Sequence, residues 1–484
     1  MKATNDETRL ASARPEDSGL FGRGMLYVVG WSAQLVVAAL VSPILAHILP
    51  PAEFGALALG ITLHQIVLVF ALLGLDQAVV LQRSADGHDS RARGLIAISI
   101  SAAALVTLLF GLTAPLWRSA VGFSEHAELV NVVILWTAPA VCVQVMLALL
   151  LTEDRFLQFA LVVGISTVGG QFLGLVLLVT VHRDATTYFM AAVVCQFTAM
   201  LLAVTFTRPR VSGLLDLSVT KHALKLGLPL TAASIALFQL SSGDRLIIQV
   251  LLGTEEVGRY QAANVMGSVV VLLLTFVSGA WTPRFAALRD ESDRWALATH
   301  SRDDLYRILL PVTVGMTLAT PITLQVILPE SFRPDSLAIV VFLISLSAFP
   351  VAAGGATGRL LIIQRRGNLI GMLTSISAVA SVILNCVLVP IWGIAGAAVA
   401  TLATYALLAA LQQRALPASP VWRKVPARLG ISVLVVISAS AASILVPQTL
   451  ELNLIRLAVA LLCLPWLAVT LMRARRSVRE VQVT

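Results

Sequence analysis

Charged side chains are scarce in this sequence. Asp, Glu, Lys and Arg make up 12% of its 484 residues, against roughly 25% in soluble globular proteins. Hydrophobic residues make up 58%, and the mean hydropathy is +0.89. This balance excludes an ordinary soluble domain and predicts that most of the chain lies in lipid.

Several sequence signatures of enzymes and cofactor sites are also missing. The chain contains no GxxxxGK[ST] motif, so hydrolysis of ATP through a P-loop is excluded, and it has no HExxH or GxSxG motif. The four cysteines have neither CxxC spacing nor nearby histidines, which favours buried packing over a metal site. We therefore expect no catalytic residues, no cofactor and no metal.

Long apolar stretches dominate what is present. A helix crosses the hydrocarbon core with about 20 mostly apolar residues, and we predict an all-α membrane protein with about fourteen such spans. The predicted spans are 25–46, 56–80, 94–115, 129–151, 157–180, 187–206, 227–250, 261–282, 307–328, 336–354, 368–390, 393–411, 429–446 and 454–472.

The distribution of Lys and Arg predicts the orientation, since positively charged connections stay in the cytoplasm. With the N-terminus inside, the inside segments carry 28 basic residues and the outside connections carry 5. Both ends are then cytoplasmic, and we expect a multi-pass protein of a bacterial inner membrane. The net charge of +8 reflects this topology and anionic lipids rather than a nucleic-acid partner.

A weak internal repeat predicts two lobes. Residues 49–55 and 252–258 share the pattern Leu, three residues, Glu, an apolar residue, Gly, at an offset of 203 residues. Six spans separate the copies, so two six-helix lobes would be related by an axis along the membrane normal, with two extra C-terminal helices. The predicted segments are a cytoplasmic lead-in without a signal peptide (1–24), the first lobe (25–206), the second lobe (207–411), a linker with spans thirteen and fourteen (412–472) and a basic cytoplasmic tail (473–484).

Residues 283–306 form the longest mixed-charge connection. We interpret it as a solvated connector in preference to a short surface helix.

Polar stripes on the first two spans of each lobe predict a cleft between the lobes, because polar groups are costly in lipid and must face a cavity or another helix. The candidate cavity residues are Tyr27, Trp31 and Gln34 on span one; His64 and Gln65 on span two; Ser241, Ser242, Asp244, Arg245 and Gln249 on span seven; Asn264 and Ser268 on span eight; and Asn385 on span eleven.

Arg245 is the most informative of these residues, because it is the one basic side chain deep in a predicted span. A guanidinium suits phosphate oxygens, so a lipid pyrophosphate headgroup is one candidate guest and a structural ion pair is the other. Asp244 should project about 100° away along a helix and should not face Arg245. A cation or another helix would then neutralise it.

Three other residues have two interpretations each. His64 could carry a proton during transport, or could be an ordinary hydrogen-bonding residue between helices. Asp76 is a candidate for ion coupling, like Asp244 and His64, or forms a salt bridge with Arg83 at a helix end. Asn385 could contact sugar hydroxyls or only pack helices.

Three stretches resemble bacterial polysaccharide and O-antigen flippases. They are LAHILPPAEFGALA at 45–58, DRLII at 244–248 with EVGRY at 256–260, and Asn385 with VPIWGIAGAAVAT at 389–401. Together they make the chain similar to the superfamily that also contains the multidrug and toxin extrusion transporters and the lipid II flippase.

The resemblance implies a function. It predicts translocation of an undecaprenyl-pyrophosphate-linked oligosaccharide by alternating access, with membrane lipids, a polysaccharide polymerase and chain-length proteins as candidate partners. In the lipid II flippase the two extra helices form a groove for the lipid tail, which spans thirteen and fourteen would imitate. Alternatives are a cation-coupled multidrug exporter, a membrane glycosyltransferase, and a scaffold in a polysaccharide assembly complex that transports nothing.

Overall fold

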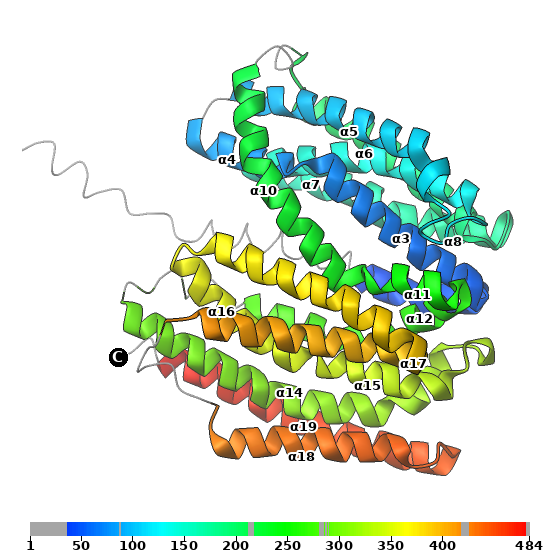
Figure 1. The fold of residues 1–484 in the computed structure, drawn as a ribbon, viewed down its shortest axis with the longest axis vertical. Coiled ribbons are helices and arrows are strands. Elements are labelled where there is room, and N and C mark those ends of the chain that lie inside the picture. The colour runs from blue at the N-terminus through cyan, green and yellow to red at the C-terminus, as the bar shows by residue number, and fades with distance from the viewer. Residues whose placement is uncertain are drawn as a thin grey trace, which may run out of the picture.

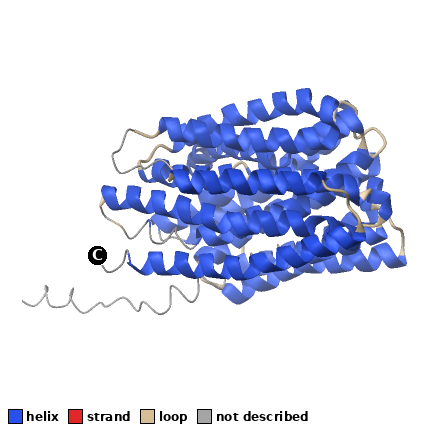
Figure 2. Ribbon diagram, turned by 90° about the horizontal axis from the view of Figure 1, so that it is seen from below, coloured by secondary structure: helices blue, strands red, loops and turns tan. Residues whose placement is uncertain are grey.

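The computed structural model describes residues 36–86, 89–211, 217–279, 290–417 and 425–480, with Phe285 and Leu288. Within these residues every regular element is a helix (Figure 2). Twelve of the helices found there are long and apolar enough to cross a membrane, and a shorter apolar helix, Val36–Ile48, precedes them. The predicted all-α membrane protein is confirmed.

The first lobe begins with the helix Val36–Ile48. Its other helices are α3 (Pro51–Leu72), α4 (Leu75–Asp86), α5 (Asp89–Trp117), α6 (Ala127–Thr152), α7 (Phe156–Val163), the π-helical turn η1 (Gly164–Gly169), α8 (Gly170–Thr180) and α9 (Ala185–Thr207).

The second lobe and the C-terminal pair follow in chain order. Their helices are α10 (Leu217–Ser242), α11 (Asp244–Leu252), α12 (Thr254–Gly279), α14 (Glu291–Ile327), the short turns η3 (Glu330–Phe332) and η4 (Pro334–Leu337), α15 (Ala338–Leu346), α16 (Ala348–Ile363), α17 (Gly367–Ala415), α18 (Ala427–Leu445) and α19 (Leu450–Glu480).

Two groups of helices are visible in Figure 1, with α3 to α9 in one and α11 to α17 in the other. Helices α18 and α19 pack on α14, at the side of the second group away from the first. Helix α10 runs between the groups and packs on α3 and α4 as well as on α17. The predicted two lobes and extra pair are therefore present, and α10 bridges the lobes.

One glycine breaks a predicted span, and another separates two predicted spans. Span seven is divided at Gly243 into α10 and α11. Spans eleven and twelve are the two parts of α17, which the chain interrupts at Gly393 with φ 59°, at the predicted boundary between them. A Cβ on Gly396 would overlap the carbonyl oxygen of Leu388, eight residues earlier, so the chain turns back here. Glycine adopts this left-handed backbone at no steric cost.

The interpretation of residues 283–306 as a solvated connector was wrong for the part that the structure describes. Helix α14 begins at Glu291 and continues into span nine. Trp295 and Ala298 are buried against Phe285 and Leu360. The frequent charges in this stretch concealed an apolar face at helical spacing.

Candidate functional site between the lobes

A cavity of about 390 Å³ lies between α3 of the first lobe and α10 and α17 of the second. Its polar lining consists of Gln65, Ser234, Ser241 and Tyr405, and none of the described lining residues is charged. The remaining walls are Leu68, Val69, Leu237, Phe238, Leu240 and Leu408. Amide and hydroxyl groups beside aromatic and apolar faces suit a neutral ligand with many hydroxyl groups. We call this space the cleft cavity.

Helices α3 and α12 approach closely beyond one end of the cleft cavity. A Cβ on Gly55 would overlap the carbonyl oxygen of Thr254, and a Cβ on Gly258 would overlap that of Pro51. Each carbonyl belongs to the residue four positions before the opposite glycine. The two copies of the sequence repeat therefore meet each other, and only glycine allows this backbone contact. We call this contact the crossing.

Side chains join the lobes beside the crossing. Gln249 Nε2 donates to the carbonyl oxygen of Gly122 at 2.8 Å and to Thr254 Oγ1 at 3.0 Å. His126 Nε2 lies 3.2 Å from the same hydroxyl. Gly122 and His126 belong to the first lobe. Gly122 lies between α5 and α6, and His126 directly precedes α6. Gln249 and Thr254 belong to the second lobe, and we call these four residues the clasp.

The lobes also touch beyond the opposite end of the cleft cavity. A Cβ on Gly74 would lie 2.7 Å from the Cα of Gly227, and a Cβ on Gly227 would overlap the carbonyl oxygen of Leu73. Leu73 and Gly74 both have positive φ and separate α3 from α4. The cleft cavity therefore lies between two backbone contacts that need glycine.

Arg245 lies in a buried polar network next to the cleft cavity. Its Nε donates to Gln261 Oε1 at 2.7 Å, and its Nη1 donates to the carbonyl oxygen of Ser241 at 3.1 Å. Asp244 accepts from Arg245 Nη1 at 3.3 Å and from the hydroxyl of Tyr260. The prediction that Asp244 and Arg245 do not face each other was wrong. The helix is broken at Gly243, so Asp244 sits at the first turn of α11, and the long guanidinium side chain folds back to it.

His64 is a packed residue of the first lobe. Its ring stacks on Trp136 with centroids 3.6 Å apart, and its Nδ1 lies 2.9 Å from Thr137 Oγ1. A hydrogen-bonding residue between helices is the role that this geometry favours.

The other predicted site residues are spread over the fold. Gln65 and Ser241 line the cleft cavity, while Ser242 is buried beside Ser241. Asn264 is half-buried on α12, and Ser268 donates to the carbonyl oxygen of Val265 on its own helix.

Two further predicted site residues, Asp76 on α4 and Asn385 on α17, do not line the cleft cavity. The last three are not among the described residues. Asp76 accepts from Gln77 at 3.2 Å. Asn385 is fully buried and donates to the carbonyl oxygen of Ser381, while its Oδ1 has no partner among the described residues. Tyr27, Trp31 and Gln34 lie outside the described residues.

Sequence reasoning missed several residues of this region. Tyr405 of the cleft cavity donates to the carbonyl oxygen of Leu240 at 3.4 Å, and its isolated position in span twelve gave no periodic signal. Gly122, His126 and Thr254 of the clasp lie in or beside connections, where a hydropathy pattern carries no information. The described residues contain no group of three His, Cys, Asp or Glu side chains able to hold a metal ion.

Residues 44–336 match the model of the family described as "Polysaccharide biosynthesis protein". The chain belongs to this family. A curated relative, the "Succinoglycan biosynthesis transport protein ExoT" of Rhizobium meliloti (strain 1021), is 26% identical over 286 residues. That match covers 58% of this chain and 56% of the relative, so the chain matches little more than half of the relative's length.

Solved structures support the fold of this family member. The "Lipid II flippase MurJ, inward closed conformation" matches 94% of this chain and 100% of that chain, with a TM-score of 0.69 and 13% identity. An inward-facing multidrug resistance MATE family transporter matches 84% of this chain and 96% of that chain, with a TM-score of 0.57 and 15% identity. At these identities the likeness is one of fold.

Proposed function

We propose that this protein is a flippase that moves an undecaprenyl-pyrophosphate-linked oligosaccharide from the cytoplasmic to the outer leaflet by alternating access. One observation carries the proposal: a neutral cavity lined with hydroxyl and amide groups lies between two lobes that touch beyond both of its ends. Family membership and the printed names of ExoT and MurJ support it.

The two glycine contacts would act as the alternating closures. With both ends of the chain in the cytoplasm, as the charge bias predicts, the crossing and the clasp close the outer side. Gly74 and Gly227 close the inner side. Rocking of the lobes then separates one contact while it keeps the other, as expected for transporters built from two repeats. The present structure corresponds to a state in which both contacts are made.

The cleft cavity would hold the sugar part of the cargo. Gln65, Ser234 and Ser241 offer hydrogen bonds to hydroxyl groups, and Tyr405 and Phe238 offer ring faces. Arg245 adjoins the cavity through Ser241, and the side-chain hydrogen bonds that it makes to described residues use Nε and Nη1. We propose that its Nη2 contacts a phosphate oxygen while the other two nitrogens hold the guanidinium in place.

Energy would come from the membrane potential or an ion gradient, because the sequence has no P-loop motif for ATP hydrolysis. Asp76, Asp244 and His64 remain the candidates for ion coupling. Asp244 is the strongest, because it is buried beside the cleft cavity and helix α11 begins at this residue. A polymerase and chain-length proteins remain proposed partners.

A cation-coupled multidrug exporter is the second candidate, favoured by the fold likeness to the MATE transporter. The uncharged described lining of the cleft cavity counts against it, since Asp244, the acid beside the cavity, is already paired with Arg245 and leaves a cationic drug without a counter-charge.

Depletion of the protein in cells tests the proposal. We expect the lipid-linked precursor to accumulate on the inner leaflet and wild-type protein to relieve this. Normal export of the precursor together with increased sensitivity to cationic compounds would instead identify the drug exporter.

A further inference from the structure

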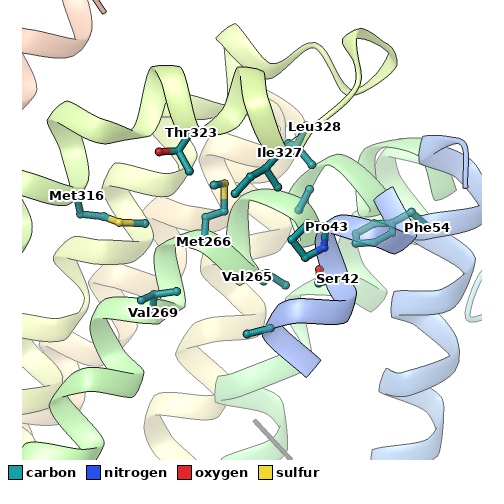
Figure 3. Close-up of a pocket in the computed structure, with 12 residues that line it drawn as sticks. Ser42, Pro43, Phe54, Val265, Met266, Val269, Met316, Thr323, Ile327 and Leu328 are labelled. Carbon is teal, nitrogen blue, oxygen red and sulfur yellow. The ribbon is translucent and has the colours of Figure 1, made fainter. Parts of the chain in front are cut away.

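A second cavity, of about 200 Å³, lies away from the cleft cavity (Figure 3). Pro43 comes from the helix Val36–Ile48, Phe54 from α3, Met266 from α12, and Met316 and Ile327 from α14. The first two elements belong to the first lobe and the last two to the second. We call this space the seam pocket, because it lies on the seam between the lobes.

The chemistry of the seam pocket excludes a sugar or a phosphate. None of its described lining residues is charged, and its walls are almost entirely hydrocarbon and thioether. A buried hydroxyl or phosphate group without a hydrogen-bond partner would be costly there. Methionine side chains adapt to irregular apolar shapes, so Met266 and Met316 suit a flexible, methyl-branched chain.

Exposed apolar side chains follow or precede lining residues of the seam pocket along the same helices. Leu40 and Ile44 on the helix Val36–Ile48 are 65% and 48% exposed, and Val326 on α14 is 72% exposed. Such a surface would be unfavourable in water and is ordinary in hydrocarbon. Molecules that reach this pocket therefore come from the lipid phase.

The position of the seam pocket relates it to transport. Phe54, one of its walls, directly precedes Gly55 of the crossing. A movement that separates α3 from α12 therefore changes the shape of the pocket. A cargo whose sugar lies between the lobes while its tail stays in lipid must have that tail pass through a seam between the lobes.

We infer that the seam pocket holds part of the polyprenyl tail of the transported lipid, an inference that rests on the proposed function. It places the tail on the seam between the lobes instead of on α18 and α19. Those two helices pack on α14, on the side away from the first lobe, and none of the described lining residues of the seam pocket belongs to them.

Photolabelling tests the inference. The probe is an undecaprenyl-pyrophosphate-linked disaccharide with a diazirine on an isoprene unit, added to the full-length protein in membranes. We expect labelled peptides that contain Met266 or Met316, with competition by unlabelled lipid-linked disaccharide but not by phospholipid. Labelling confined to α18 and α19, or equal labelling of the pocket by a diazirine phospholipid, would overturn the inference.

A substitution that fills the seam pocket provides a second test. Met266→Trp should lower labelling and export by about tenfold, because displacing two buried methylene groups has about that effect. Met372→Trp is the control, since Met372 is 54% exposed on α17. Normal labelling in Met266→Trp would contradict the inference. If wild-type protein exports the precursor but the pocket is not labelled, the inference about the pocket is contradicted and the proposed function stands. If wild-type protein exports no precursor, both the proposed function and the inference about the pocket are contradicted.

Discussion

Gly55 of α3 and Gly258 of α12 face each other at the point where the two lobes cross. They occupy the same position in two copies of one sequence motif, and each would overlap the other helix if it carried a Cβ. Two copies of a repeat meet in this way across a pseudo-twofold axis. The crossing thus connects the weak repeat in the sequence to the proposed outer closure.

Gly258→Ala should open the outer closure. Overpacking at a close contact costs about 1–3 kcal/mol, which shifts a two-state balance by roughly 5- to 150-fold. We expect a cysteine at Ser241 in the cleft cavity to react faster with a membrane-impermeant maleimide added outside. Gly371→Ala is the control, because a Cβ there meets open space. Unchanged reactivity in Gly258→Ala would contradict the role of the crossing.

Thr254→Val should weaken the same closure through the clasp. The substitution keeps the side-chain shape but removes the hydroxyl that Gln249 and His126 contact. A buried partner left unsatisfied costs about 1–3 kcal/mol, so outside labelling of the same cysteine should again rise. Thr275→Val is the matched control, because Thr275 is exposed on α12 and bonds only within its own helix. Equal labelling in the two variants would argue against the clasp.

Asp244→Asn and Arg245→Gln should each be strongly destabilising. Removal of one partner of a buried ion pair costs about 3–5 kcal/mol, because the other charge is left uncompensated. The double variant should lose less stability than the sum of the two single losses, as measured by thermal unfolding in detergent. Additive losses would show that the pair is not coupled.

The same double variant tests the proposed phosphate contact of Arg245. If Arg245 also binds the cargo, the double variant should fold and reach the membrane but fail to export the precursor. Normal export would limit Arg245 to a structural role and would exclude Asp244 as the ion-coupling residue.

Ser234→Leu should block the cleft cavity without a large loss of stability. Ser234 lines the cavity, and leucine would fill space reserved for the cargo and remove a hydroxyl group. We expect reduced export with a normal unfolding temperature. Ser375→Leu on the exposed face of α17 is the control. Full export by Ser234→Leu would place the cargo elsewhere.

Much of the fold could be predicted from the sequence, because a membrane span requires a long apolar run and cytoplasmic connections are rich in basic residues. The repeat around Gly55 and Gly258 was visible as well. Its spatial meaning was not, since a seven-residue pattern does not show which helices meet. Gln65 and Ser241 were found because polar residues in apolar runs are conspicuous.

The rest depended on local breaks and long-range contacts. The ion pair of Asp244 and Arg245 was missed because the 100° rule describes where the two side chains leave the helix, whereas the long Arg245 side chain folds back toward Ser241 and Asp244. Tyr405 reaches the cleft cavity only because the chain turns back at Gly393 and places span twelve beside α10. No sequence period reports such a contact between distant segments.

Transport by purified protein in liposomes, with a fluorescent lipid-linked oligosaccharide, tests the central claim most directly. Gly122→Cys combined with Gln249→Cys provides a lock, and Gly122→Cys alone is the control for the strain of a side chain at φ 80°. A Cβ on Gly122 would lie 2.8 Å from Gln249 Cγ, so the two Cβ atoms come within about 4 Å, as a disulfide requires. The account predicts translocation by wild type, and by the double variant only when it is reduced. Translocation that continues after cross-linking, or that needs no protein, would contradict a flippase that works by opening this closure.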